Sequence, residues 1–260
     1  MLLRMPHAVT FVGKSTPLTG AAIARAAVSL SVGVHEVWTV LRVETSGCGF
    51  LADRRPDILY ERHRFHALTG GRFDDGDLSD PTQGGYGAGG GHQYDRLMAA
   101  MALDADAALK SSSWGLGQVL GKNFASAGYA SVIEMVQAMV DSEDAQLSAV
   151  SGFILDNGLE AALKAHDWTS FARGYNGPAF ARNLYDAHLR EQFDHLATSG
   201  LPNLDVRAAQ LYLTFRGFHP GPVDGFIGKQ TRSAIVAFQE KNGFPQTGLV
   251  DDELLGQLVV

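Results

Sequence analysis

The sequence of 260 residues has little of what several classes of protein require. It contains one cysteine, Cys48, so no internal disulfide can form and folding requires no oxidising compartment. No stretch reaches the roughly 18 uninterrupted apolar residues of a membrane span. No basic run accompanies the formal net charge of -7. These absences argue against membrane insertion and against a nucleic-acid partner.

The N-terminal segment also lacks a targeting signal, because no apolar core of signal-peptide length precedes its polar residues. A hydrophobic content of 45% and a charged content of 19% are those of a soluble globular protein. We therefore expect synthesis in a cytoplasm without an export signal.

Valine-rich alternating segments are nearly absent before residue 200, whereas apolar residues recur there at helical spacing. The sequence predicts a mainly α-helical fold. The predicted helices lie within residues 17–31, 33–44, 56–71, 94–111, 131–157, 159–168 and 179–198. The glycine-rich segment 73–95 lacks the strand-then-helix setting of a phosphate-binding loop, so we expect an irregular loop.

The helix predicted for residues 33–44 ends on a carboxylate, Glu44, which shares a face with Val40 and Leu41. The small residues Ser46 and Gly47 follow and are expected to end the helix. Desolvation and the negative end of the helix dipole both favour the neutral acid. A carboxyl group that stays protonated near neutral pH suits a general acid. On this stretch alone, an outward-pointing glutamate at a helix end is the alternative.

A short repeat follows a linker at residues 199–204. Segments 217–228 and 243–255 both contain Gly-Phe and then Gly-x-Val-Asp, and each follows an amphipathic stretch. Such a repeat indicates a compact helical module of two similar halves, with no catalytic cluster in view. The apolar residues expected in its core are Ala209, Leu213, Ile235 and Phe238.

Residues 204–258 resemble the bacterial peptidoglycan-binding module found beside many wall-degrading enzymes. The residues that carry the resemblance are Gly217-Phe218, the turn Val223–Gly228, Phe238-Gln239 and Gly248–Asp251. The resemblance implies a small three-helix peptidoglycan-binding domain at residues 205–260, with bacterial peptidoglycan as its partner. We expect this domain to bind the wall and not to cut it.

The larger segment, about residues 18–195, resembles the N-acetylmuramidase domain of phage endolysins, within the lysozyme-like superfamily. Goose-type lysozymes and lytic transglycosylases of that superfamily have Glu-Ser near a helix end, then Gly-Leu-Met-Gln, then Ala-Tyr-Asn. The matching segments here, in the same order, are Glu44–Ser46, Gly115–Gln118 and Gly174–Asn176. The resemblance implies a lysozyme-like helical catalytic domain at residues 1–198, with Glu44 as its catalytic acid.

The resemblance implies an endolysin for host cell lysis, a muramidase that hydrolyses the β-1,4 bond between N-acetylmuramic acid and N-acetylglucosamine. We expect a monomer, made in the host cytoplasm, that acts on peptidoglycan in the periplasm after membrane permeabilisation. Two alternatives stay open. A lytic transglycosylase would form anhydromuramyl products without adding water, and a non-catalytic wall-binding protein would carry a degenerate lysozyme domain.

Cleavage of a glycosidic bond also needs a group that stabilises or attacks the oxocarbenium-like centre. We favour Asp53, in the loop after the predicted helix, as this second catalytic group. Glu61 is the other carboxylate candidate. The alternative for each is an ion pair with a neighbouring arginine, and a positioned water is a third possibility for the second role.

The same resemblance places Gln118 and Tyr175 in the substrate groove. An amide can bond an acetamido group, and a tyrosine hydroxyl can hold the acid or the sugar. Asn176 is expected to touch substrate or brace the backbone, and Trp114 to stack on a sugar or join the core. Tyr86, in the glycine-rich loop, is a further candidate for a glycan contact.

Other chemistries are weakly supported by the sequence. His63 and His66 lie beside Glu61, but no His-Glu-x-x-His pattern is present, so we expect no metal and no other cofactor. Cys48 lies in the loop already explained by the Glu44 motif, which argues against a thiol peptidase.

Overall fold

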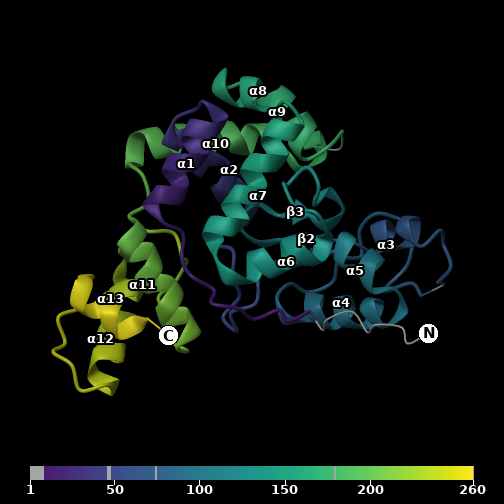
Figure 1. The fold of residues 1–260 in the computed structure, drawn as a ribbon. Coiled ribbons are helices and arrows are strands. Elements are labelled where there is room, and N and C mark those ends of the chain that lie inside the picture. The colour runs from purple at the N-terminus through teal and green to yellow at the C-terminus, as the bar shows by residue number, and fades with distance from the viewer. Residues whose placement is uncertain (1–8, 46–47, 74, 179, 260) are drawn as a thin grey trace.

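The computed structural model describes residues 9–45, 48–73, 75–178 and 180–259, and these residues form a mainly α-helical protein, as predicted (Figure 1). The helices of the larger domain are α1 (Gly20–Leu30), α2 (Val34–Thr45), α3 (Arg62–Leu68), α4 (Gly91–Leu103), α5 (Ala105–Lys110), α6 (Val132–Asp141), α7 (Glu143–Asp156), α8 (Glu160–Lys164), α9 (Trp168–Tyr175) and α10 (Tyr185–Ser199). Its short 3-10 helices are η1 (Gly115–Gly117), η2 (Gly121–Asn123) and η3 (Phe180–Asn183). The C-terminal domain contains α11 (Leu204–Phe215), α12 (Lys229–Lys241) and α13 (Asp252–Leu258).

Three short strands form an antiparallel sheet in the order β1 (Ile58–Tyr60), β2 (Ser112–Trp114) and β3 (Val119–Leu120). Ile58 lies opposite Trp114 in the register. The helix predicted across residues 56–71 is therefore wrong in its first part. The Tyr60 amide donates to the buried side chain of Gln93 at 2.9 Å, a contact from a distant segment that favours the extended conformation.

Two of the long predicted helices are each divided by a capping residue. Asp104 separates α4 from α5, and its carboxylate accepts a hydrogen bond from the Ala107 amide at 3.0 Å. Ser142 separates α6 from α7, and its hydroxyl accepts from the Ala145 amide at 3.0 Å. Aspartate and serine satisfy the free amides at a helix start, so each can begin a new helix inside an apolar pattern.

The core of the larger domain surrounds α7, which packs against α1, α6 and η1, while α10 runs along α2 (Figure 1). A separate apolar cluster forms the core of the C-terminal domain. Its buried residues are Ala209, Leu213, Ala234, Ile235, Phe238, Leu254 and Leu258. The four core positions predicted from the repeat are all among them.

The turn between α1 and α2 bends the chain by 107°. Ser31 makes this turn in the left-handed conformation, with a φ of 55°. Within the described residues no single helix has the length and apolar composition to cross a membrane, although α1 and α2 together reach both. After the bend, α2 carries Glu44 in its last turn.

The two domains are joined by a short ordered connection and touch each other. α10 ends at Ser199 and α11 begins at Leu204. Between them Pro202 is buried, and the Asn203 amide donates to the carbonyl of Gly225 at 3.0 Å. A small apolar cluster adds contacts across the boundary, because it combines Phe50 of the larger domain with residues of the C-terminal domain.

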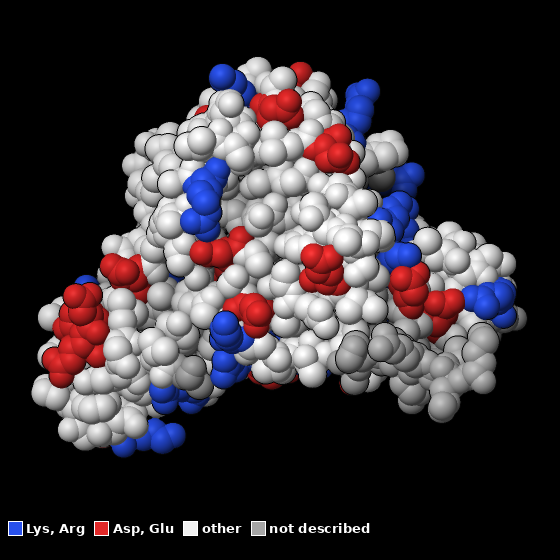
Figure 2. Space-filling view, viewed as in Figure 1, with Lys and Arg blue, Asp and Glu red and all other residues white. Residues whose placement is uncertain are grey.

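On the face drawn in Figure 2, acidic and basic side chains occur in small mixed groups. Lysine and arginine do not gather there into an extended surface of one sign. This face therefore has no concentrated positive field.

Candidate active site

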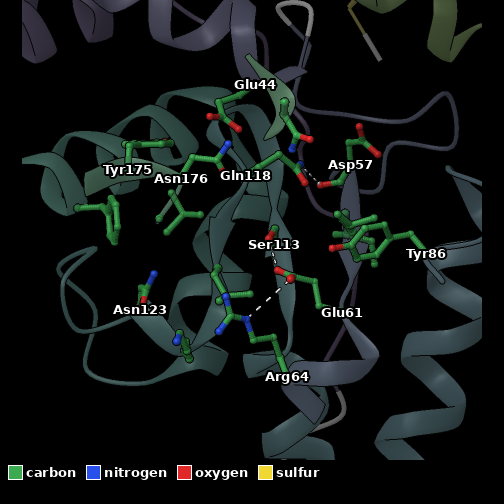
Figure 3. Close-up of a pocket in the computed structure, with 18 of the residues that line it drawn as sticks. Glu44, Asp57, Glu61, Arg64, Tyr86, Ser113, Gln118, Asn123, Tyr175 and Asn176 are labelled. Atoms are coloured by element: carbon green, nitrogen blue, oxygen red, sulfur yellow. Dashed lines mark hydrogen bonds and ion pairs between the residues drawn. The ribbon is translucent and has the colours of Figure 1, made fainter. Parts of the chain in front are cut away.

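An open cavity of about 730 Å³ lies between the end of α2, the small sheet and the end of α9 (Figure 3). It is lined by three carboxylates, by amides and by aromatic rings. The lining includes Glu44, Asp57, Glu61, Arg64, Tyr86, Gln118, Lys122, Tyr175 and Asn176.

Glu44 reaches this cavity from the last turn of α2, as predicted. Tyr185, at the start of α10, donates its hydroxyl to Glu44 Oε1. Burial raises the pKa of Glu44 and the hydrogen bond from Tyr185 lowers it by a smaller amount, so that the pKa is about 7 instead of the ordinary 4.5. A large fraction of this carboxyl group is therefore protonated at neutral pH, as a general acid requires. Ser46 and Gly47, expected to end the helix, lie outside the described residues.

Tyr175 lines the cavity but does not hold the acid. Its hydroxyl donates to the carbonyl of Gly117 at 2.8 Å. Its ring stacks on that of Tyr185, with 6.5 Å between the centroids and 12° between the planes. The tyrosine that hydrogen-bonds Glu44 is thus Tyr185, a residue that the sequence motifs did not single out.

Gln118 lies on the cavity wall between Glu44 and Asp57 (Figure 3). Its side-chain nitrogen donates to the carbonyls of Gly115 at 2.9 Å and Asp57 at 3.3 Å. Gly117, the preceding residue, has no room for a side chain, because a Cβ there would lie 2.0 Å from Val150 Cγ2. Close packing of this loop on α7 fixes the position of Gln118.

Asp53, predicted as the second catalytic group, lies outside the cavity. Its carboxylate pairs with the Arg55 guanidinium at 2.6 Å, and its side chain is half exposed. Desolvation is the largest single influence on the pKa of Asp53 and raises it, but the hydrogen bonds and the charge of Arg55 together bring that pKa below its usual value. The structure therefore supports the loop ion pair for Asp53.

Asp57, which the sequence interpretation overlooked, is the carboxylate nearest in sequence to Asp53 that lines the cavity. Burial raises its pKa, and a hydrogen bond from the Ile58 amide lowers it by less. Its own amide donates to the carbonyl of Gly49 at 2.9 Å. Nothing in the sequence distinguishes Asp57 from Asp53, because each is one aspartate near an arginine in the same loop.

Glu61 also lines the cavity, and it has the arginine partner that its structural alternative requires. Arg64 Nε lies 3.8 Å from its carboxylate and His63 Nε2 lies 3.4 Å away. Burial raises the pKa of Glu61, while the charges of Arg64 and Lys122 and a hydrogen bond from Ser113 lower it. Glu61 thus belongs to a mixed charged group in another part of the cavity from Glu44 (Figure 3).

The remaining predicted contacts divide between the cavity and the core. Tyr86 and Asn176 line the cavity, and Asn176 also caps the end of α9. Trp114 is fully buried, and its indole N–H donates to the carbonyl of Leu109 at 3.1 Å. The proposed stacking of Trp114 on a sugar is therefore wrong, because its ring packs inside the domain against Phe11.

Among the described residues, no three or more histidine, cysteine, aspartate and glutamate side chains are arranged to hold a metal ion. His63 contacts Glu61, whereas His66 Nδ1 lies 3.2 Å from the Ser79 hydroxyl. Cys48 points its thiol at the carbonyl of Phe50 at 3.2 Å, and burial raises its pKa to about 12. A thiol that stays protonated is a poor nucleophile.

Comparison with known protein families gives two matches that together span most of the chain. Residues 33–197 match the N-acetylmuramidase family. Residues 202–258 match a peptidoglycan binding domain family. The first match includes all the cavity residues named above.

A crystal structure of the Burkholderia AP3 phage endolysin is similar to this chain, with 40% sequence identity and a TM-score of 0.63. The similarity covers 70% of this chain and 71% of that one. Curated relatives match over shorter segments. The carboxy-terminal processing protease CtpB of Bacillus subtilis is 41% identical over 49 residues, which are 19% of this chain and 10% of that protein. The localization factor PodJL of Caulobacter vibrioides is 39% identical over 64 residues, 25% of this chain and 7% of that protein.

The chain thus spans a tenth or less of the length of these curated relatives, whereas it shares most of its length with the endolysin structure. The match to the N-acetylmuramidase family covers more than half of the chain. The chain belongs to the N-acetylmuramidase family and carries a C-terminal peptidoglycan-binding domain.

Proposed function

We propose that this chain is a peptidoglycan-degrading endolysin, a muramidase that hydrolyses the bond between N-acetylmuramic acid and N-acetylglucosamine. The observation that carries the proposal is Glu44, a carboxyl group with a pKa of about 7 on the wall of an open cavity. The family match and the adjoining peptidoglycan-binding domain support the substrate class.

In the proposed reaction Glu44 donates its proton to the glycosidic oxygen as the bond to the sugar C1 breaks. Positive charge then develops at C1 and its ring oxygen. Attack by water at C1 completes hydrolysis, and the proton lost by that water passes to a base. Tyr185 orients Glu44 throughout, because its hydroxyl donates to one carboxylate oxygen and leaves the other available to carry the proton.

We propose Asp57 as the group that stabilises the positive charge or activates the water, in place of Asp53. Asp57 lines the same cavity as Glu44, and Gln118 lies between the two (Figure 3). Its carboxylate has no arginine partner within the described residues, unlike Asp53 and Glu61. A carboxylate that is not already neutralised by a cation is the stronger base and the stronger charge stabiliser.

Gln118, Tyr86 and Asn176 are proposed to contact the glycan. Each places a polar group on the cavity wall, where an amide can bond an acetamido group and a tyrosine can pack on a sugar ring. The C-terminal domain is proposed to hold the enzyme on the wall, as a monomer, after the protein has left the cytoplasm in which it is made.

The test is digestion of purified peptidoglycan in water enriched in ¹⁸O, followed by mass spectrometry of the released muropeptides. Hydrolysis places one ¹⁸O atom on the new reducing end of N-acetylmuramic acid. Products that end throughout in anhydromuramic acid would contradict the proposal and indicate a lytic transglycosylase. Absence of cleavage by the folded protein, with retained binding, would indicate a wall-binding protein.

A further inference from the structure

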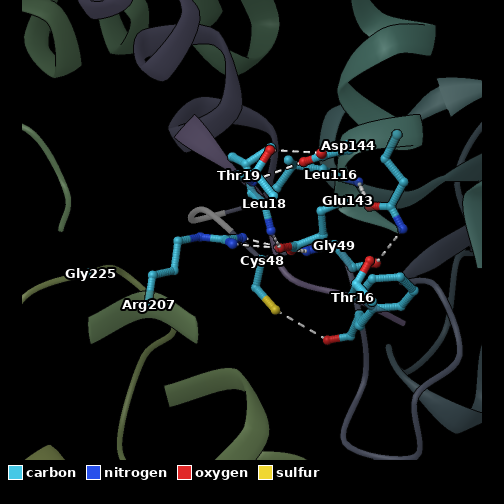
Figure 4. A network of polar contacts seen from close by, with 12 residues as sticks. Thr16, Leu18, Thr19, Cys48, Gly49, Leu116, Glu143, Asp144, Arg207 and Gly225 are labelled. Atoms are coloured by element: carbon cyan, nitrogen blue, oxygen red, sulfur yellow. Dashed lines mark hydrogen bonds and ion pairs between the residues drawn. The ribbon is translucent and has the colours of Figure 1, made fainter. Parts of the chain in front are cut away.

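An ion pair joins the C-terminal domain to the centre of the catalytic domain (Figure 4). Arg207, on α11, directs both terminal nitrogens at the carboxylate of Glu143, the first residue of α7. The two N–O distances are 2.5 and 2.6 Å, and the side chains are 1% and 0% exposed. A fully buried two-point pair across a domain boundary fixes the orientation of both partners.

Glu143 also binds the segment that follows α2, so the ion pair restrains the position of that segment. Its carboxylate also accepts hydrogen bonds from the amides of Gly49 and Leu18, each at 2.9 Å. Gly49 belongs to the segment between Glu44 and Asp57, and its carbonyl accepts the Asp57 amide at 2.9 Å. The path from Arg207 to the cavity is therefore continuous and short.

Gln146, on the same face of α7, holds the second loop of the cavity. Its side-chain oxygen accepts from the Leu116 amide at 2.8 Å, and its nitrogen donates to the carbonyl of Gly49 at 3.4 Å. Leu116 lies two residues before Gln118 in η1. The 48–57 segment and the loop that carries Gln118 are thus both hydrogen-bonded to neighbouring side chains of α7, Glu143 and Gln146, and Glu143 is paired with Arg207.

Further contacts follow the same boundary. Arg42, on α2, lies over the ring of Phe226 in the C-terminal domain, 5.7 Å from its centroid. Phe50 packs with Leu211 and Val223 in a small apolar cluster. The C-terminal domain therefore packs against α2 at Arg42 and against the 48–57 segment at Phe50.

We infer that Arg207 is a positioning residue for catalysis, supplied to the muramidase site by the peptidoglycan-binding domain. It acts through Glu143 and Gly49 to hold residues 48–57, which end at Asp57 in the cavity. This inference rests on the proposed function and changes the division of labour expected from the sequence. The C-terminal domain completes the catalytic site in addition to binding the wall.

Loss of Arg207 would leave the Glu143 carboxylate buried without its countercharge. Such a group moves toward water. This movement weakens its bond to the Gly49 amide and loosens residues 48–57, which end at Asp57 in the cavity. Water that enters there would hydrate Glu44 and bring its raised pKa back toward the ordinary value.

The experiment compares the full-length Arg207→Met variant with the wild type on soluble glycan fragments of defined length, too short to engage both domains. We expect kcat per folded molecule to fall about tenfold with little change in KM, since small displacements of reacting groups reduce the rate strongly. We also expect the alkaline limb of the pH–kcat profile to move to lower pH by roughly half a unit or more. A general acid works only while protonated, so a lower pKa moves this limb down.

Arg216→Met is the matched control, because Arg216 directly follows α11 but contacts its own domain, at the carbonyls of Leu258 and Val259. This variant should keep the kcat and the alkaline limb of the wild type. Wild-type values for folded Arg207→Met would overturn the inference. If that variant does not fold, the same measurements are made on the double variant Arg207→Gln/Glu143→Gln, which leaves no unpaired charge buried. A kcat at least about threefold lower with a shifted limb supports the inference, and wild-type values overturn it. A wild-type chain that does not cleave glycan would instead refute the proposed function.

Discussion

Glu44 and Glu143 are two carboxylates largely removed from bulk water, and their partners differ in kind. Glu44 receives a hydrogen bond from a neutral phenol, and burial raises its pKa to about 7. Glu143 receives a guanidinium and two backbone amides. A neutral donor leaves the Glu44 carboxyl group able to gain and lose a proton, whereas a two-point guanidinium pair and two amides fix the position of the Glu143 side chain.

The difference shows how one domain can hold both a reactive acid, Glu44, and a rigid anchor, Glu143. The reactive acid borders an open cavity, and its pKa lies within reach of neutral pH. The anchor is completely enclosed, and its interactions cross the domain boundary. Four experiments test whether the two carboxylates have these separate roles.

The largest expected effect is on the rate of Glu44→Gln. An amide cannot deliver the proton, so cleavage should fall by on the order of 10² or more. Stability should change little, because glutamine can still accept the hydrogen bond from Tyr185. Lysis of permeabilised cells and the melting temperature measure the two quantities. A folded variant with more than about a tenth of the wild-type rate would rule out Glu44 as the acid.

The second effect is on the free energy of unfolding and concerns the buried ion pair between Glu143 and Arg207. Arg207→Met should lower the free energy of unfolding by about 3–5 kcal/mol, because it leaves a buried charge unpaired. Asp53→Asn, which breaks the partly exposed pair with Arg55 and leaves the guanidinium over the Tyr94 ring, should cost about 1 kcal/mol or less. Urea unfolding of both variants tests the contrast. Equal losses in the free energy of unfolding would show that the buried pair contributes no more to stability than the partly exposed one.

A third pair of variants separates the two aspartates of the 48–57 segment. Asp57→Asn should lower kcat by roughly tenfold to a hundredfold if it activates water or stabilises charge. Asp53→Asn should stay within about twofold of the wild type, because its carboxylate lies outside the cavity and is held by Arg55. Steady-state kinetics on soluble glycan measure both. The reverse ranking would restore the assignment made from the sequence.

The smallest effect is a shift of the pH profile in Tyr185→Phe. The hydrogen bond from Tyr185 lowers the pKa of Glu44, so its loss should raise that pKa above about 7. The acid then stays protonated to higher pH, and the alkaline limb should move up by roughly half to one unit. This direction is opposite to that expected for Arg207→Met. A downward shift would show that burial around Glu44 depends on the tyrosine.

Much of the fold could be predicted from the sequence, because its apolar residues recur at helical spacing and its turns carry recognisable glycines. Glu44 could be placed at a helix end for the same reason. The second carboxylate could not be assigned, since Asp53 and Asp57 differ in which way the loop turns them. That direction is set by Arg55 and by Gly49, residues whose contacts appear only in three dimensions.

Tyr185 and Arg207 were missed for a related reason. Tyr185 lies 141 residues from Glu44, and Arg207 lies 64 residues from Glu143. Tyr185 and Arg207 both lie on helices, where tyrosine and arginine side chains usually face solvent. The neighbouring sequence therefore does not indicate that these two side chains are buried. Trp114 shows the opposite error, because an aromatic residue beside a glycine motif was given a substrate role and belongs to the core.

The short connection between Ser199 and Leu204 has a mechanical consequence. With Pro202 buried and Asn203 bonded to Gly225, the two domains have no slack chain between them. The distance between the C-terminal domain and Glu44 is therefore constant. We expect such an enzyme to cleave glycan strands at a fixed distance from the site where the C-terminal domain is bound. To reach further bonds it has to dissociate from the wall and bind again elsewhere.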